Sequence, residues 1–143
     1  AYVMRGPTIL LCCALAAMST GASAMRQTVE TDMGPMCLYG IVSLAEEVGK
    51  RCPKVRNAGV QALLSASVQK LDAYFVRGGW TPEQIATFKR EQAHVGAPDP
   101  KGLLCQEDTA SFYPKSKGAA EGWAAATDHI VSKARPLEWG DCL

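Results

Sequence analysis

Cysteines are the residues of this chain with the clearest chemistry, and there are six of them. Cys12 and Cys13 lie together in an apolar run, whereas the other four are spread along the remaining sequence: Cys37, Cys52, Cys105 and Cys142. A structural zinc site needs close pairs such as C-x2-C, and a redox dithiol or c-type haem site needs C-x-x-C or C-x-x-C-H. The sequence contains none of these, so the four spread cysteines predict two structural disulfides.

The histidines offer an alternative chemistry, which is ligation of a haem or a metal. His129 lies on the last predicted helix, and Met33 or Met36 near the start of the first helix are expected at the same end of the molecule. Met/His ligation of haem iron is an established mode, and this arrangement, though not the sequence, resembles b-type cytochromes built on four-helix bundles. That resemblance implies a haem- or metal-binding carrier as the alternative function. Because His94 and His129 are isolated and the spread cysteines are used as disulfides, we expect no cofactor and no metal ligands.

Hydrolytic chemistry has no motif in this sequence, since G-x-S-x-G and H-E-x-x-H are both absent. Glu46 and Glu47 are adjacent carboxylates. On a helix, adjacent side chains point about 100° apart, so these two carboxylates cannot share one proton. We expect them on a solvated face, and we expect that the protein is not an enzyme and has no catalytic residues.

Residues 1–24 have the features of a leader and a cleaved signal peptide. Met4 is the expected initiator, Arg5 supplies the positive charge, residues 9–18 are an apolar run, and residues 22–24 form an A-x-A cleavage site. The apolar run is shorter than the roughly 20 residues that a membrane helix needs. The sequence therefore predicts cleavage after Ala24 and export to a periplasmic or secreted location, where disulfides form.

Residues 25–143 are expected to form a single helical domain, because their length is sufficient for one core. The whole chain has 15 basic and 14 acidic residues. Arg5 is the only charged residue in the predicted leader, so removal of the leader leaves equal numbers of basic and acidic residues and a formal net charge of zero. A neutral domain lacks the basic stripe that nucleic-acid binding requires. We therefore expect no nucleic-acid partner, and the sequence after the leader has no apolar run long enough to span a membrane.

Apolar residues recur at three- and four-residue steps along most of residues 35–134, and this periodicity predicts helices. The predicted fold class is all-α, a small up-down bundle of about four main helices stapled by two disulfides. The main helices are expected at about 35–50, 57–77, 81–94 and 119–134, with a short helix within 103–113.

Two helix starts carry strong local signals. Asn57 is a predicted N-cap, and Thr81, Pro82 and Gln84 form a capping box with proline at the first helical position. Lys89 is expected on the solvent side of the same helix. These signals place the second and third helices more securely than their apolar periodicity alone.

The disulfide pairing follows from the length of the first helix. Cys37 and Cys52 lie at its opposite ends, about 22 Å apart at ~1.5 Å per residue, whereas a disulfide needs Cα atoms roughly 4.4–6.8 Å apart. In an up-down bundle, Cys105 returns to the end of the molecule that holds Cys52, and Cys142 returns to the end that holds Cys37. The predicted pairs are therefore Cys52–Cys105 and Cys37–Cys142.

Two aromatic residues, Phe112 and Tyr113, lie beside a proline in an irregular segment. Of the aromatic residues, they have the least evident role in the predicted core. They are the candidate partner-binding residues, while Trp139 is expected to cover the Cys37–Cys142 end. We therefore expect a small exported protein with a non-catalytic binding role, whose partner is another protein. The expected types are an inhibitor or immunity protein, or one that acts in envelope stress.

Overall fold

The computed structural model describes residues 33–142, which form an all-α structure without strands, as predicted. The predicted leader and signal peptide at residues 1–24 lie outside the described residues. The elements in chain order are α2 (Pro35–Arg51), α3 (Ala58–Arg77), α4 (Pro82–Ala93), the 3-10 helix η1 (Leu103–Cys105), α5 (Glu107–Ala110) and α6 (Lys117–Val131). Within residues 33–142, none of the helices has the length and apolar character that crossing a bilayer requires.

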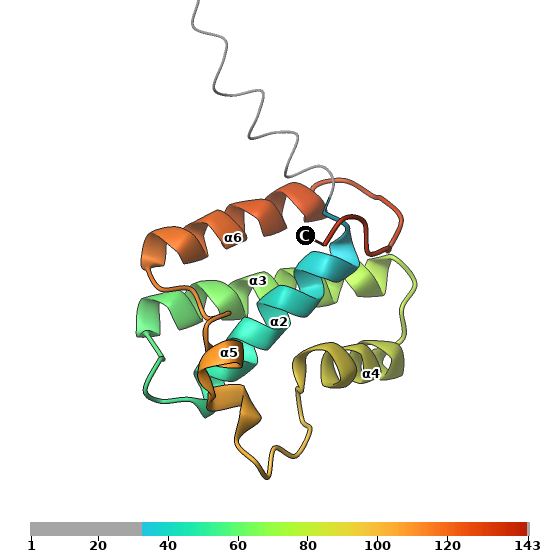
Figure 1. Cartoon of the computed structure of the whole chain (residues 1–143). Helices are drawn as coiled ribbons and strands as arrows, with labels where there is room; N and C mark the ends of the chain where they lie inside the picture. The colour runs from blue at the N-terminus through green and yellow to red at the C-terminus, as the bar shows by residue number, and fades with distance from the viewer. Residues whose placement is uncertain (1–32, 143) are drawn as a thin grey trace, which may run out of the picture.

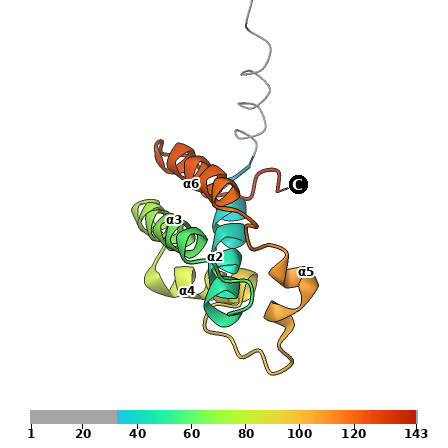
Figure 2. The ribbon, with the colours of Figure 1, turned by 90° about the vertical axis from the view of Figure 1, so that its left-hand side faces the viewer.

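Helix α2 is the centre of the molecule, and it packs against α3, α4, η1, α5 and α6 (Figures 1 and 2). The chain reverses direction between α2 and α3 and again between α3 and α4, which confirms the predicted up-down bundle (Figure 1). Helix α6 packs chiefly on α3 and runs in the same direction, since Lys70 pairs with Asp128 at 2.5 Å and the Tyr74 hydroxyl donates to the Lys133 carbonyl at 2.9 Å. The α2–α3 pair therefore separates α4 from α6.

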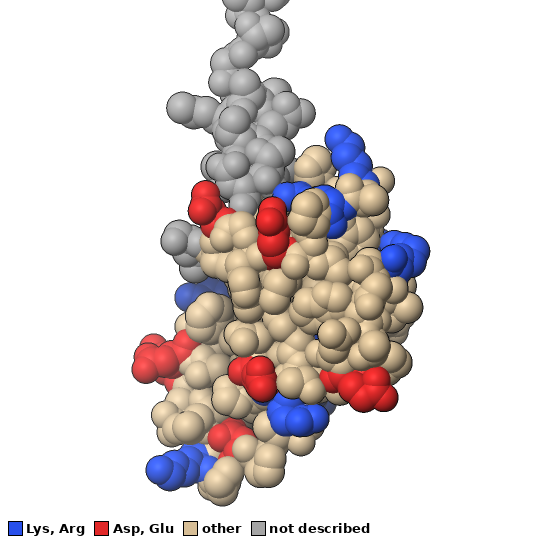
Figure 3. All heavy atoms as spheres, turned by 90° about the vertical axis from the view of Figure 1, so that its right-hand side faces the viewer, with Lys and Arg blue, Asp and Glu red and all other residues tan. Residues whose placement is uncertain are grey.

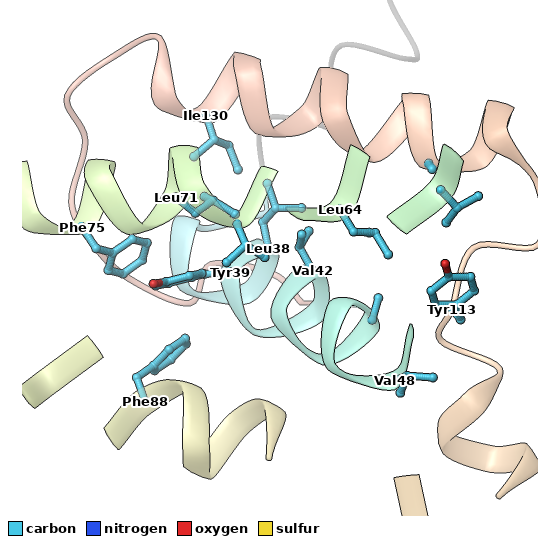
Figure 4. Close-up of a cluster of buried hydrophobic side chains, with 14 of the residues drawn as sticks. Leu38, Tyr39, Val42, Val48, Leu64, Leu71, Phe75, Phe88, Tyr113 and Ile130 are labelled. Atoms are coloured by element: carbon cyan, nitrogen blue, oxygen red, sulfur yellow. The ribbon is translucent and has the colours of Figure 1, made fainter. Parts of the chain in front are cut away.

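The core is rich in aromatic rings at the junction of α2, α3 and α4. The ring of Tyr39 lies 4.5 Å from that of Phe75 and 5.4 Å from that of Phe88, measured between centroids (Figure 4). Trp80, in the turn between α3 and α4, packs edge-on against both phenylalanines. Aliphatic residues continue the core along α2, α3 and α6; among them are Leu38, Val42, Val48, Leu64, Leu71 and Ile130.

Side-chain caps begin three of the helices. The Asn57 side chain accepts from the Val60 N–H, and Thr81 and Gln84 form the reciprocal capping box, so both predicted caps are confirmed. Ser116 accepts from the Ala119 N–H, and α6 therefore begins two residues before the predicted start at residue 119. The predicted short helix within residues 103–113 is divided into η1 and α5.

The start of α2 is held by backbone groups from the other end of the domain. Gly34, its N-cap, has no capping side chain; its N–H donates to the Trp139 carbonyl, and the Met36 N–H donates to the Glu138 carbonyl, both at 3.0 Å. A Cβ atom on Gly34 would lie 2.3 Å from that Glu138 oxygen, so only glycine allows this approach. The C-terminal segment thereby satisfies N–H groups that a helix start leaves unpaired.

Both predicted disulfides are present. Cys37 pairs with Cys142 and Cys52 with Cys105, each with Cα atoms 5.5 Å apart. They lie near opposite ends of α2, as the helix-length argument required. One fixes the C-terminal segment to the start of α2, and the other fixes η1 just beyond its end.

The expectation that Glu46 and Glu47 are solvated is wrong, because each residue is only 7% exposed. Glu46 pairs with Lys50, and Glu47 pairs with Arg51 at 2.8 Å. The Arg51 guanidinium also donates to the carbonyls of His94 and Ala97, in the segment that follows α4. A segment distant in sequence therefore covers this side of α2, and each buried carboxylate has a cationic partner, as burial requires.

Lys89 also differs from its prediction, because it lies partly buried between α3 and α4 rather than on the solvent side. Its ammonium group lies 3.1 Å from a carboxylate oxygen of Asp72 and 5.9 Å from the centroid of the Tyr39 ring. The Tyr39 hydroxyl donates to the same carboxylate. Lys89 thus belongs to a polar network that joins α2, α3 and α4.

Candidate functional site

The two predicted partner-binding residues lie in different environments. Phe112 is 44% exposed, whereas Tyr113 is 4% exposed. The Tyr113 hydroxyl accepts from the Asn57 N–H at 3.1 Å and lies within hydrogen-bond distance of the Asn57 carbonyl and the Gln61 side chain. Tyr113 therefore holds the start of α3 from inside the molecule, and only Phe112 is available to a partner.

Phe112 lines an apolar surface hollow of about 250 Å³ between α2, α4 and the C-terminal segment. Ile41 and Leu44 of α2 line it from one side, and Trp139 from another, next to the Cys37–Cys142 disulfide. Trp139 is itself 41% exposed. Trp139 thus lies at the Cys37–Cys142 end, where it was expected, and its exposed ring adds a second aromatic residue to the hollow.

A second hollow, of about 380 Å³, lies along α4 and has Trp80 and Phe88 in its lining. The ring of Trp139, which lines the first hollow, lies 5.6 Å from the ring of Phe88, which lines the second, so the two hollows are neighbours. We call the surface formed by Trp80, Phe112 and Trp139 around the buried ring of Phe88 the aromatic face. It is built by the α3–α4 turn, α4, the segment after α5 and the C-terminal segment, and the Cys37–Cys142 disulfide holds the last of these in place.

The charges near the aromatic face are acidic. Glu83 and Glu91 line the hollow along α4, and Glu138 and Asp141 are exposed within two residues of Trp139. No described lysine or arginine lines either hollow, and none forms an ion pair with these four carboxylates. We call the four carboxylates the acidic rim. Figure 3 views the right-hand side of Figure 1, where uncharged surface in the middle has both acidic and basic side chains around it.

Three other surface hollows have basic residues in their lining. Arg77 and Arg135 line one between α3 and the segment after α6, and Lys89 and Arg90 line one between α3 and α4. The third, beside the Cys52–Cys105 disulfide, is lined by several basic residues, which are Lys54, Arg56 and Lys115. The acidic character of the aromatic face is therefore local and does not follow from the composition of the chain.

The histidines do not lie in a ligand cluster. His94 is the C-cap of α4 in the left-handed conformation, and His129 is exposed on α6, while Met33 and Met36 pack against the core. Among residues 33–142, no group of three or more His, Cys, Asp or Glu side chains could hold a metal ion. The described structure therefore adds no geometric support to the haem or metal alternative.

The network of Tyr39, Asp72 and Lys89 has the most perturbed ionisable group. Burial raises the pKa of the Tyr39 phenol well above its ordinary value, and the hydrogen bond to Asp72 raises it further. A phenol that stays protonated and donates to a carboxylate is a hydrogen-bond donor, not a nucleophile or a base at neutral pH. We therefore assign this network to the packing of three helices rather than to catalysis.

Sequence analysis did not identify the contribution of Trp80 and Trp139 to one surface with Phe112. Trp139 had a usable signal, because a tryptophan among polar residues and glycine outside any predicted helix is a frequent interface residue. The contact between Trp139 and Phe88 joins residues far apart in sequence, and no spacing rule predicts it.

Comparisons with known proteins give no relative for this chain: no family model, no curated protein and no solved structure matches it. The class that its fold defines is a small all-α domain with two disulfides.

Proposed function

We propose that this chain is a non-catalytic binding protein that recognises another protein through its aromatic face. The observation that supports this is the exposure of Phe112 and Trp139 around one apolar hollow. Aromatic residues in such positions contribute most of the binding energy in many protein interfaces, and clustered exposed apolar surface is typical of interaction sites.

The proposed location is outside the cytoplasm, either periplasmic or secreted. Disulfides persist in oxidising compartments and are rare in the cytosol, and both disulfides of this domain hold segments far apart in sequence. The signal peptide predicted at residues 1–24 would provide the export. A stapled domain with an apolar binding surface suits an inhibitor, an immunity protein or an envelope-stress protein, and these are the types that we propose.

A capture experiment tests the proposal. The protein is incubated with an extract of the source organism and chemically crosslinked, and mass spectrometry identifies the proteins in the crosslinked complex. Phe112→Ala should weaken capture of a specific partner at least tenfold, which corresponds to about 1.4 kcal/mol. Leu103→Ala is the matched control, since Leu103 is also a large exposed apolar residue but does not line either hollow. Capture that is equally strong with Phe112→Ala and with Leu103→Ala would refute a role for the aromatic face.

A visible absorption spectrum separates this proposal from the carrier alternative. We expect no Soret band from the purified protein, because His129 is exposed and isolated on α6. A Soret band that disappears in His129→Ala would replace the binding proposal with haem transport.

A further inference from the structure

We infer that the partner presents a cationic apolar segment to the aromatic face, with apolar side chains in the two hollows and lysine or arginine side chains against the acidic rim. This inference rests on the proposed function and specifies the chemistry of the partner. The shape and the charge of the surface support it independently.

The shape argument comes from Trp139. Its exposed ring lines the hollow beside the Cys37–Cys142 disulfide and contacts the ring of Phe88, which lines the hollow along α4. Two hollows joined through one pair of contacting rings match successive apolar side chains of a single segment, as when an amphipathic helix docks into a groove. The segment therefore needs at least two apolar side chains on one side.

The charge argument comes from the acidic rim. Glu83, Glu91, Glu138 and Asp141 are exposed and have no ion pair with any described residue. Some other surface carboxylates have cationic partners, as Asp128 has Lys70 and Glu121 has Lys117. Exposed Glu107 and Asp108 also lack an ion pair with a described residue, so what distinguishes the rim is its position around the aromatic face. A cationic segment would complement the rim, whereas an acidic segment would be repelled, and such complementarity determines partner choice and association rate.

Other occupants fit the surface less well. Nucleic acid and anionic lipid carry the same sign of charge as the rim. A second copy of this chain would have to present a different surface that carries basic residues, such as Lys54, Arg56 and Lys115 beside the other disulfide, because no described lysine or arginine lines the two hollows. Contact between two different surfaces of identical chains forms a ring or an open filament rather than a simple dimer.

Two synthetic peptides test the charge of the partner. Both are amphipathic helices with leucine and tryptophan on one side, and they differ only in carrying lysine or glutamate on the other. Calorimetric titration into the oxidised protein should give at least tenfold tighter binding of the lysine peptide at low salt. The preference should fall steeply at about 1 M salt, where the screening length is about 3 Å.

Charge-matched variants show whether the preference comes from the acidic rim. Glu83→Gln with Glu91→Gln removes two rim carboxylates, and Glu107→Gln with Glu121→Gln removes two exposed carboxylates that line neither hollow. The net charge changes equally in both proteins. We expect the first pair to weaken binding of the lysine peptide about fivefold or more, and the second pair to leave it unchanged.

The outcomes separate this inference from the proposed function. Equal affinity for the two peptides, or an equal effect of the two variant pairs, overturns the cationic partner; the aromatic face remains supported if Phe112→Ala still weakens binding. If neither peptide binds, the inference is also overturned. The proposed function is then decided by the capture experiment alone. Concentration-dependent self-association that Phe112→Ala abolishes, measured by sedimentation, would identify a second copy as the occupant instead.

Discussion

The hydroxyl of Tyr39 is the most informative single group to remove. Tyr39 is fully buried, and its hydroxyl donates to Asp72, which also pairs with Lys89 at 3.1 Å. Tyr39→Phe keeps the ring contacts with Phe75 and Phe88 and removes only this hydrogen bond. A hydrogen bond to a charged acceptor contributes about 1.5–3 kcal/mol. Because Lys89 remains to pair with Asp72, we expect the lower limit, a loss of about 1.5 kcal/mol at neutral pH.

This hydroxyl also makes stability depend on alkaline pH. Burial and Asp72 raise the pKa of Tyr39 in the folded state above its ordinary value of 10.0, and Glu46 on the same helix adds to the effect. The unfolded chain ionises first, so the contribution to stability is complete below pH 10 and is lost as the pH rises above it. For a single group whose pKa is raised in this way on folding, the free energy of unfolding falls by about 1.4 kcal/mol between pH 9 and pH 11.

Urea unfolding without reductant at pH 7, 9 and 11 measures both effects. Lys89 and the other ionisable groups are present in both proteins, so the difference between the wild type and Tyr39→Phe isolates the phenol. Tyr74→Phe is the control for the neutral-pH loss, since its hydroxyl donates to the uncharged Lys133 carbonyl and its removal should cost only about 1 kcal/mol. A gap between wild type and Tyr39→Phe that is as wide at pH 11 as at pH 7 would refute the assigned role of the buried phenol.

Three further predictions concern the caps, the disulfides and export. Thr81→Ala should cost about 1 kcal/mol in denaturant melts through loss of the capping box, whereas Thr87→Ala, exposed within the same helix, should stay within about ±0.5 kcal/mol; equal losses would contradict the cap. Replacing Cys52 and Cys105 by serine should cost about 4 kcal/mol in the chain-entropy treatment, given their separation of 53 residues, and an unchanged urea midpoint would contradict it. N-terminal sequencing of the exported protein should begin at Met25, and a mature chain that retains residues 12–13 would disprove the predicted cleavage.

Features that depend on neighbouring residues were predictable from the sequence. The capping box at Thr81 and the cap at Asn57 need only three or four consecutive residues. The disulfide pairs needed one further fact, which is that a straight helix keeps Cys37 and Cys52 apart. The order of the main helices and their alternating direction followed from periodicity and from the breaks between them.

Features that depend on which segment covers which helix were not predictable in the same way. Glu46 and Glu47 were expected on a solvated face, yet both are buried, and Glu47 pairs with Arg51, which the segment after α4 holds through two carbonyls. Tyr113 follows Phe112 directly, but one ring points to solvent and the other inward. The aromatic face needs the C-terminal segment to return to α4, and only the folded chain shows that contact.

The burial of α2 has a consequence for the order in which this domain folds. During synthesis α2 emerges before every element that covers it, and the carbonyl groups that pair with its first N–H groups belong to residues 138–139. Early folding of α2 is therefore unfavourable, because its apolar residues stay exposed until α3 and α4 have emerged, and its start lacks partners until residues 138–139 follow. The described domain should fold fully only once residues 138–142 have been synthesised, and truncation just before Trp139 should leave an aggregation-prone chain, since it removes a hydrogen-bond partner of Gly34 and the Cys37–Cys142 disulfide.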